Sequence, residues 1–173
     1  MKVSFAEGPK VEILVLAKKE IESIVTQDDV IEAVEMSFRA DGEGDLIQPQ
    51  KEPMYVDPPR NKNFLIAMPG CLRNINVAGV KWGGVYFNQK EGIPTTWGVV
   101  QVLSDPETGI AFAILDATSI TALRTAGGHA LVAAKYLAKK DSKVMAIIGC
   151  GAEARTGCVA FDKMYKLEKI NIF

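Results

Sequence analysis

Apolar positions in the first forty residues follow the spacing of an amphipathic helix. They recur every three or four residues, at Val30, Ile31, Val34 and Phe38. This pattern predicts helices over residues 18–25 and 28–40. Thr26 followed by Asp29 resembles a capping box with Asp in place of Glu, which predicts the start of the second helix. The run Asp41–Asp45 predicts a turn after it.

Short apolar runs separated by turn residues follow from about residue 54 to residue 116. Prolines exclude helix from the first part of this region; they are Pro49, Pro53, Pro58 and Pro59. The runs predict strands over Met54–Val56, Phe64–Met68, Val77–Phe87, Thr96–Leu103 and Ile110–Leu115. The links are too short for helical crossovers, so we expect an antiparallel or mixed meander.

The last third of the chain predicts one long helix over Thr118–Ala138 and then a βαβ unit. Val144–Ile148 has the composition of a buried strand, and a turn of two glycines follows it before a helix begins. Gly149 would permit the tight turn, Gly151 would let the backbone approach a pyrophosphate at the helix N-terminus, and small Ala154 would allow close packing.

Lys169–Phe173 predicts the second strand of this unit, and the sequence ends within it. The acidic residue that reads a ribose is expected at the tip of that strand, past Phe173. We therefore expect the chain to be the front half of a cofactor-dependent enzyme. The fold class expected is α/β: an α+β region over residues 1–116, a connecting helix over 117–140, and an incomplete dinucleotide-binding Rossmann domain over 141–173.

Charge and composition narrow the function. The formal net charge is −1 and there is no basic block, so we expect no nucleic-acid partner. The apolar runs are too short to cross a bilayer, and the first residues lack a signal-peptide pattern. Three cysteines without zinc spacing and a single histidine, His129, argue against a metal site or a Ser-His-Asp triad. Reduced thiols indicate a cytoplasmic protein.

Lys81 and Arg124 are the strongest candidates for chemistry. On a strand, Lys81 shares one face with Gly79 and Gly83, which would leave room for a ligand against the backbone. The alternative is an exposed strand face that carries a lysine. Arg124 lies in a helix with almost no other charge, where it could hold a carboxylate or form a structural ion pair at a domain junction.

Other polar residues and glycines carry weaker signals. Lys51 in its extended segment and Thr95 near a predicted strand start have no distinctive context of their own. Gly127 and Gly128 weaken a helix interior, which indicates close approach of a neighbouring element or of a cofactor. His129 is predicted to be a packed or surface residue rather than a ligand.

Three segments resemble the ornithine cyclodeaminase/μ-crystallin family. They are VKWGGVYFN, IPTTWGVVQVLSDPETGIAFAILDATSITALRTAG and KYLAKKDSKVMAIIGCGAEA. The resemblance covers most of residues 10–173. It implies an NAD(P)-dependent enzyme of amino-acid metabolism, with a substrate-binding and dimerisation domain beside a Rossmann domain, working as a homodimer. The family includes ornithine cyclodeaminase, an alanine dehydrogenase branch and μ-crystallin.

The resemblance also implies roles for individual residues. Lys81 matches the strand lysine that meets the substrate carboxylate and the reacting centre, which makes it the catalytic candidate. Arg124 matches the arginine that holds the carboxylate beside the cofactor, and Thr95 matches a threonine near the nicotinamide. Lys51, expected to bind substrate, stands where an arginine is common. The phosphate-binding turn corresponds to Gly149, Gly151, Ala152 and Glu153.

Departures from the family pattern affect the choice of substrate and cofactor. Glu153 stands where glutamine is usual, and a carboxylate beside a pyrophosphate is electrostatically unfavourable. Ile66 stands near the position of a glutamate in the ornithine enzymes, which makes recognition of a distal amine less favourable. The aspartate that is catalytic in the family belongs to a part of the fold beyond this sequence.

The preferred hypothesis is an NAD(P)-dependent oxidoreductase or deaminase of a small amino or imino acid. One alternative is a true ornithine cyclodeaminase, which closes a ring with no net redox change. Another is a non-catalytic ligand-binding protein of the μ-crystallin kind. A third is a fragment whose main property is dimerisation through the apolar strands between Val77 and Leu115.

Overall fold

The computed structural model describes residues 2–4, 11–56, 62–87 and 91–173. The chain divides into two compact units, Met1–Ser23 with Ala40–Thr118 and Ile24–Arg39 with Ser119–Phe173. Both contain strands and helices, and the expected α/β class is confirmed. Each unit is described separately below.

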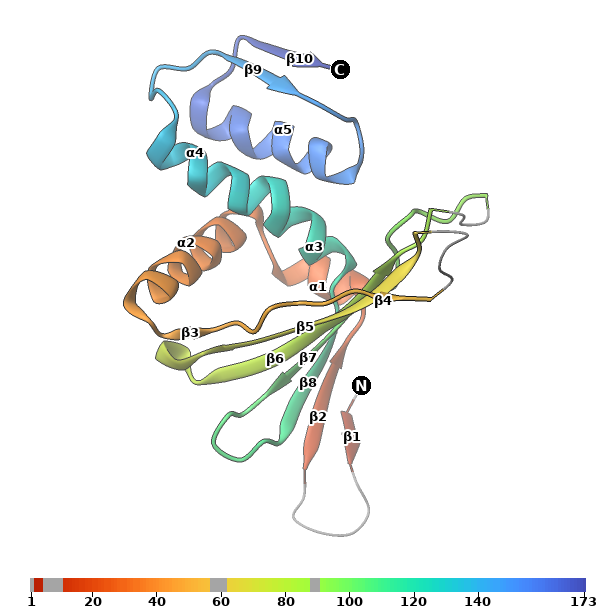
Figure 1. Cartoon of the computed structure of the whole chain (residues 1–173). Coiled ribbons are helices and arrows are strands. Elements are labelled where there is room, and N and C mark those ends of the chain that lie inside the picture. The colour runs from red at the N-terminus through yellow and green to blue at the C-terminus, as the bar shows by residue number, and fades with distance from the viewer. Residues whose placement is uncertain (1, 5–10, 57–61, 88–90) are drawn as a thin grey trace. The chain divides into compact units, whose positions relative to one another are not determined.

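The first unit is built on one sheet with the strand order β1-β2-β8-β7-β6-β5-β3, and β4 pairs with β5 (Figure 1). The strands are β1 (Lys2–Ser4), β2 (Glu12–Leu16), β3 (Leu46–Ile47), β4 (Met54–Tyr55), β5 (Phe64–Leu72), β6 (Val77–Val85), β7 (Val100–Ser104) and β8 (Ala111–Asp116). Strands β5 to β8 are successive antiparallel neighbours, while β2 is parallel to β8. The predicted mixed meander is therefore correct.

Some predicted boundaries in this unit are wrong. The strand predicted from residue 96 begins at Val100, because the chain bends at Thr95 and Thr96 and Gly98 takes a positive φ of 67°. The predicted turn over residues 41–45 begins too early. Helix α2 (Gln27–Glu43) continues to Glu43, and Gly44, with a φ of 81°, follows its last residue. Strand β2 was not among the predicted strands; helix α1 (Lys18–Ile24) follows it.

The capping box is present at the start of α2. The Thr26 backbone N–H donates to the Asp29 carboxylate at 2.8 Å, and the Asp29 N–H donates to the Thr26 hydroxyl at 3.2 Å. These reciprocal bonds satisfy backbone donors that the helix itself leaves without partners. The Thr26 hydroxyl also donates to the Asp29 carboxylate at 2.5 Å, and this bond, followed by the one from the Thr26 backbone N–H, lowers the pKa of Asp29.

The second unit contains the first part of α2, a three-segment helix, and a βαβ unit. The segments are α3 (Thr118–Arg124), the π-helical η2 (Thr125–Ala130) and α4 (Leu131–Leu137), followed by β9 (Val144–Ile147), α5 (Ala152–Tyr165) and β10 (Lys169–Ile172). Strands β9 and β10 pair in parallel, as the βαβ prediction requires (Figure 1). The long helix predicted over residues 118–138 is continuous but changes its hydrogen-bond spacing in the middle.

The two glycines of η2 are explained by the close approach of α2. A Cβ on Gly127 would lie 2.7 Å from the Gln27 amide, whose Nε2 donates to the Gly127 carbonyl at 3.0 Å. A Cβ on Gly128 would lie 2.8 Å from the Val34 side chain. Val34 also belongs to the buried cluster with Val30 and Val132. Of the two predicted explanations for this glycine pair, close approach of a neighbouring element is therefore correct.

A second contact between α2 and α4 is electrostatic. Glu35 of α2 accepts a hydrogen bond from Lys135 at 2.7 Å, from the Tyr136 hydroxyl, and from Arg39 at 3.3 Å. The Glu35 side chain is 17% exposed. These donors, Lys135 first and Tyr136 next, lower the pKa of Glu35 to about 2.

The stability of the protein is predicted to fall in acid partly through Glu35. Its folded pKa of about 2 lies below the ordinary value of 4.5, so its contribution is complete above about pH 4.5 and is lost as the pH falls toward 2. Thermal unfolding of the wild type and of Glu35→Gln from pH 7 to pH 2 measures it. The variant should be less stable near neutrality, and the gap should close in that acid window. Glu32→Gln, at an exposed glutamate of the same helix, is the control. A gap independent of pH would contradict the assignment.

Candidate functional site

Lys81 lies in the middle of β6, where it pairs with Met68 of β5 and Gln101 of β7. Residues directly opposite on antiparallel strands point to the same face of a sheet. The face that carries Lys81 on β5, β6 and β7 is otherwise almost entirely apolar. Its members are Phe64, Ile66, Met68, Gly70, Leu72, Val77, Gly79, Lys81, Gly83, Val85, Gln101 and Leu103. None is a carboxylate, and Lys81 is half-buried.

The glycines beside Lys81 do not leave the room that the sequence suggested. A Cβ on Gly79 would lie 2.6 Å from the Val102 carbonyl oxygen, and a Cβ on Gly83 would lie 3.2 Å from the Val99 side chain. These positions are filled by the protein itself. The expectation of ligand space against the backbone at Gly79 and Gly83 is therefore wrong.

Lys51 lies in the segment between β3 and β4, and it is exposed. Both of these strands pair with β5, Ile47 with Cys71 and Met54 with Leu65, so the segment between them follows β5 (Figure 1). Counting residues along the segment from either pairing places Lys51 at about the level of Met68 on β5. On its other side, β5 pairs Met68 with Lys81 of β6. The register thus brings the two candidate lysines to the same level of the sheet.

Thr95 lies in the bend before β7, not at a strand start, and it is exposed. Its carbonyl oxygen accepts the Tyr86 backbone N–H at 2.9 Å, which ties this loop to the residue just after β6. The hydrogen bond keeps Thr95 beside the same strand that carries Lys81.

The glycine turn has the geometry expected of a phosphate-binding loop. Gly149 has a φ of 99°, which favours glycine, and a Cβ on Gly149 or Gly151 would meet nothing within 4 Å. Both glycines therefore border open space that a larger residue would enter. Gly151 caps α5 without a side-chain hydrogen bond, so the N–H groups that follow it are available to an anion.

Ala152 and Glu153 form the first turn of α5, and both are exposed. Alanine at this point adds no side chain that would crowd an approaching group. Glu153 places a carboxylate next to the positive end of the helix dipole, where it stabilises the helix but repels another anion.

Arg124 is brought to the first turns of α5. The Thr156 hydroxyl of α5 donates to the Ala122 carbonyl at 3.0 Å, and a Cβ on Gly157 would lie 3.1 Å from the Ala126 methyl. Arg124 lies between these two contact points at the end of α3, and it is half-buried. Within the described residues of its own unit it forms no salt bridge.

His129 and Cys150 have no ligand-like setting. The His129 ring packs edge-on against Phe38, with ring centroids 5.0 Å apart, and its Nδ1 lies 3.2 Å from the Arg124 carbonyl. Cys150 is an exposed free thiol in the glycine turn. Among the residues that the structure describes, no cluster of His, Cys, Asp or Glu could hold a metal ion.

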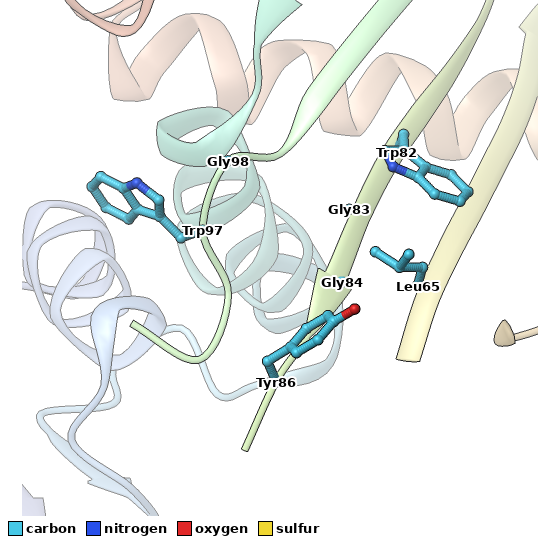
Figure 2. A pocket seen from close by; sticks show the side chains of 7 residues that line it. All are labelled: Leu65, Trp82, Gly83, Gly84, Tyr86, Trp97 and Gly98. Atoms are coloured by element: carbon cyan, nitrogen blue, oxygen red, sulfur yellow. The ribbon is translucent and has the colours of Figure 1, made fainter. Parts of the chain in front are cut away.

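A pocket of about 220 Å³ lies elsewhere in the first unit. Figure 2 shows its walls: Leu65, Trp82, Gly83, Gly84, Tyr86, Trp97 and Gly98. Trp82 pairs with Ala67 and Val100, so it belongs to the sheet face opposite Lys81. None of the described residues that line the pocket is charged. The Lys18 ammonium lies over the Trp97 ring, 4.8 Å from its centroid.

Comparison with known proteins identifies the family. The ornithine cyclodeaminase/mu-crystallin family model matches residues 11–173. The chain belongs to this family. It is 37% identical over 165 residues to alanine dehydrogenase of Archaeoglobus fulgidus, covering 94% of this chain and 48% of that protein. It is 31% identical over 160 residues to iminosuccinate reductase of Paracoccus denitrificans, covering 91% of this chain and 48% of that one.

Two solved structures also match this chain closely. An archaeal alanine dehydrogenase, a dimer with bound NAD, matches with a TM-score of 0.83 and 35% identity over 92% of this chain and 48% of that chain. The Δ(1)-pyrroline-2-carboxylate reductase of Thermococcus litoralis, in complex with NADH and L-proline, matches with a TM-score of 0.84 and 34% identity over 92% and 49%. The chain thus spans about half the length of the relatives it matches.

One polar residue was not singled out from the sequence. Gln101 is directly opposite Lys81, on the same face. The sequence does show a polar residue inside the apolar run VVQVL. Which residue it faces depends on the strand register, which sequence periodicity does not give.

Within its described residues, the structure has no helix long and apolar enough to cross a membrane.

Proposed function

We propose that this chain supplies the substrate-binding unit and the first part of the dinucleotide-binding unit of an NAD(P)-dependent oxidoreductase or deaminase. Its substrate class is a small amino or imino acid. The observation that carries the proposal is the similarity of this chain to dehydrogenases and reductases of such acids, with Lys81, a half-buried lysine of β6, at the position that the family resemblance gives to the catalytic strand lysine.

Binding of the substrate carboxylate is assigned to three cationic side chains. Lys81 and Lys51 lie at the same level of the sheet in the first unit, and Arg124 of the second unit is a half-buried guanidinium that can bind a carboxylate through two N–H groups. Lys81 would also polarise the reacting carbon–nitrogen group or carry its proton. Thr95 is assigned to the nicotinamide side of the site.

The cofactor is a nicotinamide dinucleotide, NAD or NADP, which when bound exchanges a hydride with the substrate carbon that bears nitrogen. Gly149, Gly151, Ala152 and Glu153 would hold its pyrophosphate. The fit rests on open space at the two glycines and on free N–H groups at the start of α5. Ile66 at the lysine face offers no countercharge to a distal amine, which favours net oxidation or reduction over ornithine cyclisation.

We further propose domains over residues 1–116 and 141–173 joined by a connecting helix over 117–140, and a cytoplasmic location. All three cysteines, Cys71, Cys150 and Cys158, are free, as in proteins of a reducing compartment.

A homodimer is proposed through the sheet face opposite Lys81. One row across it is Pro69, Val80, Val102, Ile114 and Val15. On the same face Trp82 is 43% exposed and Phe112 is 40% exposed. An exposed apolar sheet face of this kind marks an interface. A second copy is the occupant that fits, because the similar alanine dehydrogenase is a dimer.

Replacing Lys81 tests the activity. With a panel of small amino acids and NAD or NADP, the complete enzyme that includes this chain should accumulate NADH or NADPH, and Lys81→Met should lower its kcat/KM by about 100-fold or more. Lys140→Met, at an exposed lysine, should have no effect. Ring closure without reduced cofactor would indicate a cyclodeaminase, and cofactor binding without any turnover would indicate a ligand-binding protein; either contradicts the proposal.

Glu153 is predicted to weaken cofactor binding. Glu153→Gln removes a negative charge from the phosphate-binding turn, so NADH affinity should rise about threefold to tenfold at low salt and by less at high salt. The unliganded variant should be slightly less stable, because a carboxylate favours the helix N-terminus. Fluorescence titration with NADH and thermal unfolding without it measure the two effects. Glu168→Gln, an exposed glutamate outside the turn, is the control, and equal affinities in all three proteins would contradict the assignment.

A charge in the apolar face should break the dimer. Val102→Glu would bury an unpaired carboxylate at the interface and weaken association by roughly 100-fold or more. Light scattering over a dilution series should give a dimer for the wild type and for Val102→Thr, and a monomer for Val102→Glu. A wild-type monomer at every concentration, or a dimer that survives Val102→Glu, would remove this face as the interface.

A further inference from the structure

The segment over residues 91–98 lies between β6 and β7 and carries Thr95. All of its residues are exposed. Gly92 and Gly98, near its two ends, have positive φ values of 82° and 67°, a conformation that favours glycine. A surface segment with little buried area opens easily unless specific contacts hold it. The position of Thr95 therefore depends on the contacts that this segment makes.

Backbone hydrogen bonds attach this part of the chain to the sheet at two points. The Thr95 carbonyl accepts the Tyr86 N–H at 2.9 Å, and the carbonyl of Val99, just past the segment, accepts the backbone N–H that follows β8 at 2.8 Å. Between these two points lies Trp97, whose ring centroid is 4.8 Å from the Lys18 Nζ. A cation at this distance over an indole ring is attracted by it. The Lys18–Trp97 contact is thus a further attachment, made by side chains, two residues from Thr95.

Packing encloses only part of the Trp97 ring. The residue is 53% exposed, and it borders the pocket of about 220 Å³ whose other walls include Trp82 and Tyr86 (Figure 2). A ring that borders both solvent and a cavity has room to change its position. The attraction of the Lys18 ammonium therefore contributes directly to where Trp97 lies.

Lys18 itself belongs to regular secondary structure. It is the first residue of α1, which directly follows β2, and β2 pairs in parallel with β8. Ile21 of the same helix is 3% exposed and anchors it in the core of the unit. The Lys18 ammonium also lies 3.7 Å from the Glu22 carboxylate, one helical turn further on. The cation that meets Trp97 is thus fixed by the sheet and by α1 and not by the segment that it contacts.

We propose that Lys18 is a positioning residue for Thr95: its ammonium holds Trp97, and Trp97 holds the segment in which Thr95 faces the nicotinamide. The role of Thr95 rests on the proposed function, and the Lys18–Trp97 contact does not. Hydride transfer depends on the alignment of the reacting groups, so a displaced Thr95 segment lowers the rate of that step. The effect is modest in size, because an exposed cation–π contact shifts a conformational equilibrium by about twofold to fivefold.

The first experiment measures the attachment itself and needs no turnover. The Tyr86 amide is bonded to the Thr95 carbonyl, so its hydrogen exchange reports how often the segment leaves β6. Lys18→Met should speed this exchange about twofold to fivefold. Lys18→Arg, which keeps a cation, should restore the slow exchange, and Lys19→Met, at the exposed neighbouring lysine, is the matched control. Unchanged amide exchange along β8 shows that the effect is local. Equal Tyr86 exchange in all of these proteins would overturn the proposal.

A double-mutant cycle tests whether Lys18 acts through Trp97. Trp97→Leu should also speed Tyr86 exchange, and Lys18→Met should add nothing to it, because the second change removes a contact that is already lost. Additive effects of the two substitutions would mean that the side chains act independently, and they would overturn the contact as the cause.

The second experiment measures the consequence for the reaction in the complete enzyme that includes this chain. Lys18→Met should lower the single-turnover rate of hydride transfer about twofold to fivefold, with smaller changes in KM for the amino acid and in NADH affinity. In a Thr95→Val background the same Lys18→Met change should have no further effect on the rate. Faster Tyr86 exchange with an unchanged rate of hydride transfer would overturn the positioning role.

Failure of the proposed function gives a different result. A wild-type enzyme that turns over no amino or imino acid would overturn the proposed function and with it the role of Thr95, while the exchange results would still report on the Lys18–Trp97 contact. Circular dichroism and thermal unfolding show that each variant is folded. The Lys18 side chain is 41% exposed, so its replacement leaves no buried cavity.

Discussion

The register of the β5–β6–β7–β8 ladder is the constraint on which the site in the first unit depends. Because side chains alternate along each strand, one register puts Lys81, Gln101 and Met68 on one face and Val80, Val102 and Ile114 on the other. A slip of one residue on β6 alone would move Lys81 into the apolar row and leave its charge against valines. The glycines of β6 belong to the same constraint, since the Val102 carbonyl and the Val99 side chain occupy the space where side chains at Gly79 and Gly83 would lie.

In the second unit the corresponding constraint is the close packing of helices through small residues. Gly127 and Gly128 admit Gln27 and Val34 of α2, and Gly157 of α5 admits the Ala126 methyl. With glycine at 127 and 128, α2 approaches the π-helical segment on one side, and with glycine at 157, α5 approaches it on another. Arg124, just before that segment, is thereby held near the start of α5 and its glycine turn. A π-helical segment is less favourable than an α-helix, and such segments often lie at functional sites.

The sequence predicted features that depend on local chemistry. The Thr26–Asp29 capping box, the apolar strand before Gly149 and the positive φ at that glycine are each determined by a few adjacent residues. Features that depend on distant partners were missed or misplaced. Strand β2 is stabilised by parallel pairing with β8, roughly a hundred residues away, and its apolar run is too short to distinguish from other buried segments. The space beside Gly79 and Gly83 could not be judged from β6 alone, because its occupants come from Val99 and Val102. The position of Gln101 opposite Lys81 is likewise not visible until β7 is paired with β6.

Charge is distributed unevenly over the candidate site, and this has a consequence for binding. Lys81 lies on a sheet face whose paired strand positions on β5 and β7 hold no carboxylate, and Lys51 lies at about the same level in the segment that follows β5. At the start of α5 the helix dipole and the open backbone N–H groups attract an anion, but Glu153 already supplies one. Substrate and cofactor would therefore bind under different electrostatic regimes. Salt weakens attraction between the lysines and a carboxylate, and it also weakens repulsion between Glu153 and a pyrophosphate. Raising the ionic strength should for this reason raise KM for the acid relative to the dissociation constant of the dinucleotide, a ratio that depends on these residues and not on the overall net charge of −1.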